Sequence, residues 1–384
     1  MLLAIPLAWL QLVREKVRLC IALAGIAFAV ILMMMQLGFR DALFDSSVTF
    51  HLSLNTDIVL ISPQSTTLIA MKSFARSRLY QALAIPEVAS VSPLYLNRAL
   101  WRNPETRGTR QIFLIGFDPD DQVFNLPGVV QNQNQIKQTD VVLFDQDSRP
   151  EFGPIVSEFL ANRPVETEVA GRRIRVGGLF SLGASFGADG NLITSDLNLL
   201  RILNQSSLGL IDLGLIKVKP GVEVNQVVDQ LTATLPDDVI VLSKDGFIQF
   251  EKSYWQNSTS IGFVFTLGTI MGFIVGTVIV YQILYTDVSD HLPEYATLKA
   301  MGYKSTFFYA VVLQEAVILS FLGFIPGFGL CLVLYNLTRN ATSLPIAMTP
   351  DRGVIVFMLT VIMCVFSGAI AMRRVQAADP ADIF

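Results

Sequence analysis

Catalytic chemistry needs a nucleophile, metal ligands or a nucleotide cradle, and this sequence holds few residues with suitable spacing. The chain has two histidines, His51 and His291. Residues 291–294 read His-Leu-Pro-Glu, which is not the HExxH spacing of a zinc protease. Residues 302–305 resemble the end of a Walker loop, but Tyr303 stands where that loop requires glycine. We therefore expect no catalytic residue, no metal site and no cofactor site in this chain.

Cysteine usage and net charge argue against two further classes of protein. Cys20, Cys331 and Cys364 all lie in apolar segments, where cysteine behaves as a small hydrophobic residue. The formal net charge is −4. Nucleic-acid-binding domains usually carry a basic surface. We therefore expect neither a disulfide framework nor a nucleic-acid partner.

Gln314 and Glu315 are the most unusual polar residues, because they lie inside a long apolar stretch. An ionised carboxylate in hydrocarbon costs several kcal/mol, by most scales about 3 or more. We therefore expect Glu315 to face another helix or a water-filled vestibule. The sequence supports two roles for it equally, a gate and a simple hydrogen-bonding pin between helices.

Four apolar stretches dominate the chain, at residues 19–39, 258–285, 305–335 and 353–372. Only 16% of the residues are charged, whereas soluble domains carry about 25%. Each stretch has about the 20 residues that a transmembrane helix needs. The sequence therefore predicts an α-helical membrane protein with four spans and a large domain, residues 40–257, between the first two spans.

Basic residues beside the spans predict the orientation, because cytoplasmic loops are enriched in Lys and Arg. These residues are Arg14, Lys16, Arg18, Lys299, Lys304, Arg373 and Arg374. We expect the coupling segment 286–304 and both termini in the cytoplasm, and the large domain in the periplasm. The short periplasmic loop, residues 336–352, departs from the rule with Arg339 and Arg352. Residues 1–18 are expected to form an amphipathic helix on the inner leaflet of the inner membrane, and residues 373–384 a cytoplasmic tail.

The large domain shows the same order of elements near both its ends. A strand, a helix and a strand are expected at 57–62, 71–84 and 88–99, and again at 213–218, 222–235 and 239–242. We interpret residues 45–119 and 206–255 as one porter-like α+β part with residues 120–205 inserted as a second subdomain. A hairpin turning at Ala170-Gly171 is expected in the insertion. Residues 246–260 are expected to form a helix that runs straight into the second span.

Glycines in two of the spans indicate close helix packing. Gly268, Gly272 and Gly276 repeat every four residues and share one helix face, and Gly323 and Gly327 flank Pro326. Two interpretations remain open for these glycines. They can serve packing within one chain, or the face of the second span can form a homodimer contact.

The segment between the second and third spans reads as a short amphipathic helix, residues 291–301, that Gly302 ends with a turn. Leu292, Tyr295, Ala296 and Leu298 are expected to dock in a groove of a partner. Glu294, Lys299, Ala300 and Gly302 fit the pattern E-x-(A/G)-x-x-K-A-x-G, with Leu298 before the lysine, and Glu315-Ala316 follows in the next span.

This arrangement resembles the FtsX/MacB-type permeases of ABC transporters, and the four-span layout resembles them too. The opening residues 5–19 and the run Met35–Val48 are most similar to the DevC branch, the permeases of cyanobacterial DevBCA exporters. Where the family usually has Arg before the Glu, this chain has His291-Leu292-Pro293.

The resemblance implies a MacB-like fold and a homodimeric membrane subunit without its own ATPase site. Two copies of a separate DevA-like ABC ATPase would bind ATP and Mg and push on a coupling helix. That helix would comprise His291, Glu294, Leu298, Lys299, Ala300 and Gly302. The motion would drive the periplasmic domain to deliver lipid or glycolipid cargo to a DevB-like adaptor and a TolC-like outer-membrane channel.

Other functions of the same superfamily remain open. Lipoprotein-releasing permeases have a domain of similar size, whereas regulators of cell-wall hydrolases have a smaller one. A membrane sensor is a third possibility. Affinity purification from native membranes would discriminate among them, because an exporter would bring an ATPase and an adaptor with it.

Overall fold

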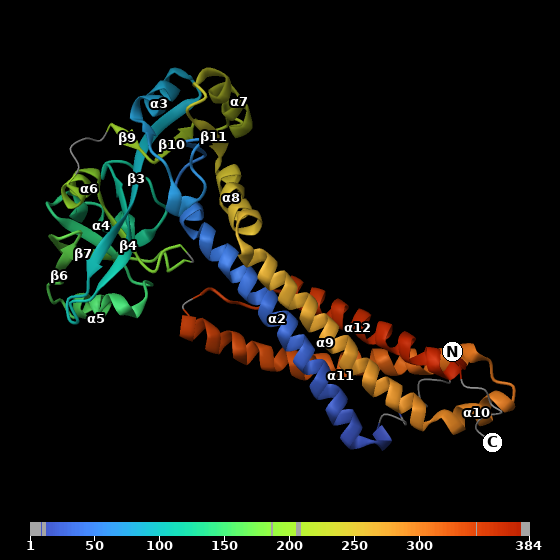
Figure 1. The fold of residues 1–384 in the computed structure, drawn as a ribbon. Coiled ribbons are helices and arrows are strands. Elements are labelled where there is room, and N and C mark those ends of the chain that lie inside the picture. The colour runs from blue at the N-terminus through green and yellow to red at the C-terminus, as the bar shows by residue number, and fades with distance from the viewer. Residues whose placement is uncertain (1–8, 10–12, 186, 205–208, 343, 378–384) are drawn as a thin grey trace. The chain divides into compact units, whose positions relative to one another are not determined.

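The computed structural model describes residues 9, 13–185, 187–204, 209–342 and 344–377 (Figure 1). The chain divides into two compact units. The helical unit comprises residues 1–42, 260–342 and 346–384, and the sheet unit comprises residues 43–259 and 343–345. Most of the amphipathic helix expected over residues 1–18 lies outside the described residues; Trp9, Val13 and Arg14 are helical.

The sheet unit is built on nine strands in the order β11-β1-β10-β3-β4-β8-β5-β7-β6. The strands are β1 Ile58–Ile61, β3 Val88–Arg102, β4 Thr109–Phe117, β5 Val141–Asp145, β6 Glu166–Val169, β7 Arg172–Phe180, β8 Asn191–Ser195, β10 Leu213–Val218 and β11 Ile240–Ser243. A separate small sheet pairs β2 Phe74–Ala75 with β9 Leu210–Ile211. The α-helices of this unit are α3 Arg76–Gln81, α4 Pro127–Asn132, α5 Ile155–Leu160, α6 Asp196–Leu203, α7 Val224–Thr234 and α8 Lys244–Ser253.

Two interleaved strand-helix-strand repeats form one part of the sheet, as the sequence predicts. The first is β1-α3-β3 and the second is β10-α7-β11. Strand β10 lies between β1 and β3, and β1 lies between β10 and β11, with every neighbouring pair antiparallel. Each repeat is therefore completed by a strand of the other. The helix expected over 71–84 is shorter than predicted, because Phe74 and Ala75 pair with β9 as a strand.

Both faces of this part of the sheet are buried, which explains why its strands are continuous apolar runs. Along β1, Ile58 and Leu60 join one hydrophobic cluster, which Leu79 of α3 and Leu231 of α7 also enter. Their neighbours Val59 and Ile61 join a second cluster on the other face, which contains Phe247 of α8. The alternation of side chains along a strand thus places helices on both faces.

Residues 120–205 do not form a body separate from the porter-like part. Their strands β5 to β8 extend the same sheet beyond β4, and β6 meets β3 again where Trp101 pairs with Val169. The Trp101 side chain is fully buried, and its indole N–H donates to the Phe152 carbonyl at 3.0 Å. The expected hairpin is present: β6 and β7 pair around Ala170 and Gly171, which have positive φ angles of 51° and 80°.

The helix expected to run from residue 246 into the second span is interrupted, so that prediction was wrong. Helix α8 ends at Ser253, a wider π-helical turn covers Tyr254–Ser258, and Thr259 has extended backbone angles. Beside the turn, the buried Glu251 carboxylate accepts hydrogen bonds from Thr67 Oγ1 at 2.6 Å and Trp255 Nε1 at 2.8 Å. Burial raises the pKa of Glu251, and these donors oppose the rise because they favour the charged form.

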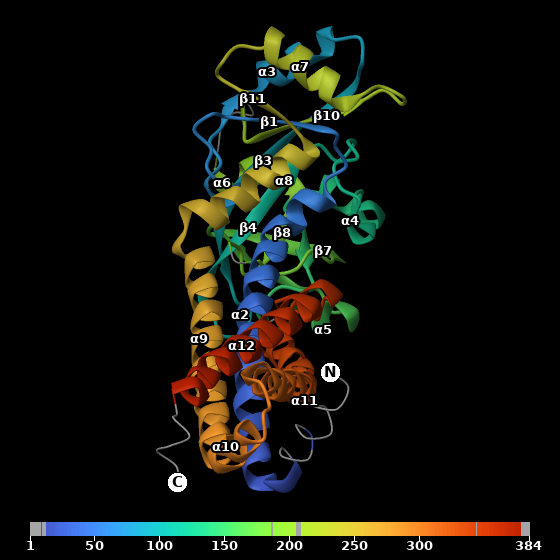
Figure 2. The same cartoon turned by 90° about the vertical axis from the view of Figure 1, so that its right-hand side faces the viewer.

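The helical unit contains the four predicted spans. They are α2 Lys16–Ser53, whose residues beyond Ala42 belong to the sheet unit, α9 Ser260–Asp290, α11 Ser305–Thr342 and α12 Pro350–Ala377, with the short α10 Leu292–Ala300 between α9 and α11 (Figure 2). All four are long and apolar enough to cross a membrane. A helix satisfies its own backbone hydrogen bonds, as hydrocarbon requires. With 38 residues each, α2 and α11 are about 57 Å long, well beyond a hydrocarbon core of about 30 Å.

The glycine face of α9 packs within the same chain. A Cβ added at Gly272 would lie 3.3 Å from Leu32 Cβ of α2, and one at Gly276 would lie 2.6 Å from Ala29 Cβ of α2. One at Gly268 would meet the amide of Gln36, again on α2. Helix α2 and, at Gly276, Met363 of α12 therefore cover this face within one chain. A homodimer contact would need another surface.

Two glycines of α11 bring that helix against the other side of α2. A Cβ at Gly323 would lie 2.6 Å from Ile26 Cβ, and one at Gly327 would lie 3.0 Å from both Cα and the carbonyl oxygen of Ala27. Helix α11 continues through Pro326 without interruption. Between helices in lipid, such close backbone approach provides the attraction, since the hydrophobic effect contributes little there.

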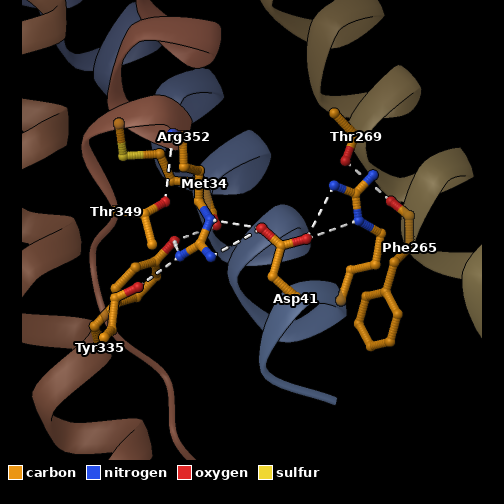
Figure 3. A network of polar contacts seen from close by, with 9 residues as sticks. Met34, Asp41, Phe265, Thr269, Tyr335, Thr349 and Arg352 are labelled. Atoms are coloured by element: carbon orange, nitrogen blue, oxygen red, sulfur yellow. Dashed lines mark hydrogen bonds and ion pairs between the residues drawn. The ribbon is translucent and has the colours of Figure 1, made fainter. Parts of the chain in front are cut away.

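A polar network ties α2 to α11 and α12 (Figure 3). The Arg352 guanidinium donates to Asp41 Oδ2 through Nη2 at 2.9 Å and through Nε at 3.1 Å, and its Nη1 donates to the Ala347 carbonyl at 2.7 Å. The Tyr335 hydroxyl lies 3.4 Å from the same Nη1 and donates to the Met34 carbonyl. Only 5% of the Arg352 side chain is exposed. Arg352, which departs from the basic-residue rule, is thus paired with the partly exposed carboxylate of Asp41.

Substitution of Gly327 by alanine should destabilise the bundle, whereas the same change at Gly329 should not. The new methyl group at 327 meets the α2 backbone, which cannot rotate away as a side chain can. Overpacking of this kind costs about 1–3 kcal/mol. Nothing lies within 4 Å of the Cβ position at Gly329, so alanine there gains up to about 1 kcal/mol of helix propensity. Thermal unfolding of the purified chain in detergent measures both; equal midpoints would contradict the packing.

Substitution Arg352→Met should lower the free energy of unfolding by about 2 kcal/mol, because it leaves Asp41 without its buried partner. The expected cost is below that of a fully buried pair, since Asp41 is 31% exposed and also accepts from Arg40. Arg339→Met is the matched control, because the Arg339 side chain is exposed and donates to Asn336 on its own helix. If both variants lose a similar free energy of unfolding, the contacts of Arg352 do not stabilise the bundle.

Candidate functional site at the junction of α9, α10 and α11

Helix α10 begins and ends at residues suited to those positions. Pro293 occupies the first turn, where its missing N–H has no intrahelical partner to lose, and Glu294 lies at the positive end of the helix dipole. At the other end Gly302 has a φ of +99°. Its N–H donates to the Lys299 carbonyl at 3.0 Å, and the Tyr303 N–H donates to the Leu298 carbonyl at 3.1 Å. This pair of bonds is a Schellman motif, so the turn predicted at Gly302 is confirmed.

The apolar side of α10 packs on its own bundle. The Tyr295 side chain is 2% exposed, and its ring centroid lies 5.3 Å from that of Phe308 on α11. Leu298 packs partly buried against the same cluster, which contains Val288 of α9 and Val312 of α11. Tyr295 was expected to dock in a partner, and the structure corrects this. It instead anchors α10 to the helices that flank it.

The predicted coupling residues divide into an exposed set and a half-buried set. Glu294, Ala300 and Gly302 are exposed, whereas His291, Leu298 and Lys299 are half-buried. Two further exposed side chains, Met301 at 65% and Tyr303 at 47%, follow the helix directly. A partner that approaches α10 would thus meet Glu294 at one end and an apolar pair, Met301 and Tyr303, at the other.

Glu315 is fully buried and faces another helix, as expected from the cost of a carboxylate in hydrocarbon. Its carboxyl group is close enough to interact with that of Asp287 on α9. Its neighbour Gln314 is half-buried. The sequence placed Glu315 near another helix, and the structure identifies that helix as α9.

Sequence reasoning missed Asp287, Asp290 and Arg18 as members of this site. Helix α9 continues past the predicted end of the span to Asp290, so both aspartates lie on its last turn. Arg18 of α2 pairs with Asp290, and its Nη1 lies 3.4 Å from Asp287 Oδ1 and 2.9 Å from Glu15 Oε2. The signal available was the spacing of 287 and 290, which puts both side chains on one helix face.

His291 links this cluster to α10. It follows α9 and forms the N-cap of α10, and its Nδ1 lies 3.0 Å from the Asp287 carbonyl oxygen and 3.8 Å from Asp287 Oδ1. Within the described part of the chain, no group of three or more His, Cys, Asp or Glu side chains could hold a metal ion. His291 thus contacts the end of α9, and Tyr295 contacts α11, so α10 is attached to both neighbouring helices.

Comparisons with known proteins agree with the architecture. A family model described as the MacB-like periplasmic core domain matches residues 19–234, more than half of the chain. A model described as the FtsX-like permease C-terminal matches residues 266–380, which include α10 and Glu315. A search of curated proteins gives no match.

Two solved structures are similar to the chain at low identity. The periplasmic region of MacB from Actinobacillus actinomycetemcomitans is 15% identical with a TM-score of 0.36, and the match covers 53% of this chain and 94% of that one. The extracellular domain of the noncanonical ABC-type transporter YknZ from Gram-positive bacteria is 13% identical with a TM-score of 0.34, covering 49% and 100%. The assignment rests on the family models, which cover both the sheet unit and the spans. The chain belongs to the MacB/FtsX-type family of ABC transporter permeases.

Proposed function

We propose that this permease is the membrane subunit of an exporter and that α10 is its coupling helix, on which a separate ABC ATPase acts. The observation that carries the proposal is the two-sided character of α10. Its inner side is fixed to α9 and α11 through Tyr295 and Leu298, while Glu294 and Met301 remain exposed. A helix that is anchored on one side and open on the other transmits a push without losing its fold.

The mechanical path in this proposal runs through α2. Helix α2 continues without a break from Lys16 to Ser53 and thus belongs to both units. The connection from α8 to α9 is interrupted by the π-helical turn and the extended Thr259. A continuous helix transmits an axial displacement better than one broken by extended backbone, so α2 would act as the lever and the α8–α9 connection as the hinge.

The partners and cargo follow from the resemblance to the DevC branch. The assembly would contain a homodimer of this chain in the inner membrane, with both termini in the cytoplasm, and two DevA-like ATPases that bind ATP and Mg. The sheet unit would lie in the periplasm and deliver an envelope glycolipid to a DevB-like adaptor and a TolC-like channel. The absence of charge between Ile261 and Leu284 favours this route over a polar pore through the spans.

Glu294→Arg should abolish coupling while leaving the fold intact. The side chain is exposed at the start of α10, so reversal of its charge opposes a partner surface without a cavity or a buried charge. We expect at least a tenfold loss of the ABC ATPase that copurifies with the tagged full-length chain from native membranes. Asp229→Arg makes the same change of charge at an exposed position of α7 and should retain the ATPase.

Retention of an ATP-hydrolysing partner by Glu294→Arg at the wild-type level would overturn the role of α10. Cargo is tested separately, by comparing extractable envelope glycolipids between a deletion strain and strains rescued with wild type or Glu294→Arg. Unchanged glycolipids in the deletion strain would refute this cargo and leave the coupling result unaffected.

A further inference from the structure

Two carboxyl groups meet inside the helical unit without a donor for each of their oxygens. Glu315 of α11 is fully buried and Asp287 of α9 is 6% exposed, and the two carboxyl groups are close enough to interact. Among the described residues, Glu315 Oε1, Glu315 Oε2 and Asp287 Oδ2 are buried and accept no hydrogen bond. Three buried carboxyl oxygens therefore lack a hydrogen-bond donor among the described residues.

Among the residues whose side chains the structure describes, the charge near these two groups is too scarce to neutralise both. Arg18 reaches Asp287 Oδ1 at 3.4 Å, but it also pairs with Glu15 and Asp290, so one cation serves three carboxylates. His291 Nδ1 lies 3.8 Å from the same Asp287 oxygen. Within the described part of the chain, neither of these two side chains forms an ion pair with Glu315. Gln314, an amide, precedes Glu315 on α11, and Tyr295 packs in the cluster that contains Val288, the residue after Asp287.

Two adjacent carboxylates with little access to water cannot both be ionised, because their repulsion adds to the cost of burying each charge. One proton between them removes a negative charge and supplies the missing donor. The resulting O–H···O⁻ bond is charge-assisted, which makes it one of the stronger hydrogen bonds in proteins. A bound metal cation fits less well, since Ca²⁺ and Mg²⁺ take six or more oxygen ligands and three oxygens are open here.

We propose that Asp287 and Glu315 form a proton-binding site in which one shared proton joins α9 to α11. The proton lies between Asp287 Oδ2 and a Glu315 oxygen, and Arg18 balances the remaining negative charge from the other side of Asp287. Because His291 contacts both the Asp287 carbonyl and its carboxyl group, the site is connected directly to the start of α10. This proposal does not depend on the transport function.

Infrared spectroscopy of the purified full-length chain in lipid nanodiscs at neutral pH tests the proposal. A carbonyl stretching band of a protonated carboxylic acid is expected in the wild type. It should disappear in Glu315→Gln and change in frequency in Asp287→Asn, where Glu315 stays buried but loses its carboxylate partner. Glu294→Gln is the matched control, because it removes an exposed carboxyl group from α10 and should leave the band unchanged. Burial also raises the pKa of Glu251 and of Asp145, so either group could contribute an acid band of its own. The variants Glu251→Gln and Asp145→Asn identify any acid band that persists in Glu315→Gln.

The spectrum of each variant is subtracted from that of the wild type. If neither difference, for Glu315→Gln or for Asp287→Asn, contains an acid band, the proposal is overturned. Sodium provides the second measurement. If a cation rather than a proton joined the carboxylates, replacing Na⁺ by choline would lower the unfolding temperature of the wild type but not that of Glu315→Gln. We expect no difference between the two salts in either protein. Because the amide introduced by Glu315→Gln can donate to Asp287, this variant should also unfold within about 3 °C of the wild type.

Discussion

Close backbone packing around α2 is the constraint on which the helical unit depends. Gly272 and Gly276 of α9 approach α2 on one side, and Gly323 and Gly327 of α11 approach it on another. Between apolar helices in lipid, dispersion contacts at this range replace the hydrophobic effect as the attraction. The polar contacts follow from the same arrangement, because Arg18 and Asp41 reach their partners only if α2 lies beside α9, α11 and α12. These two residues are about 35 Å apart along the helix, close to the thickness of a bilayer core.

The sheet unit is held together because strands from both ends of its sequence alternate in one sheet. Because β1 lies between β10 and β11, and β10 between β1 and β3, the two ends of residues 43–259 cannot part without breaking the sheet. Glu251 adds polar contacts near the end of α8, because its buried carboxylate accepts hydrogen bonds from both Thr67 and Trp255. The π-helical turn that follows interrupts the regular backbone hydrogen bonding between α8 and α9.

The junction at α10 shows how a correct local prediction can still misplace a function. The amphipathic pattern of residues 291–301 and the turn at Gly302 were both identified from the sequence. The apolar face was assigned to a partner, yet Tyr295 packs on Phe308 of the same chain. Periodicity identifies which side chains share a face of a helix, but it contains no information about what covers that face. The same ambiguity left the glycine face of α9 open between packing within one chain and a second copy.

The sequence by itself determined what depends on neighbouring residues. Hydropathy located the four spans, Ala170-Gly171 the hairpin, and Gly302 the end of α10, since each is decided within a few residues of chain. Only the tertiary structure decided that Asp287 meets Glu315 across 28 positions, that Arg352 is neutralised by Asp41, and that residues 120–205 extend one sheet. The same holds for the break at Thr259, where one continuous helix was expected but the backbone becomes extended. These features require groups far apart in the chain to meet, and their energies come from packing and charge that no local pattern records.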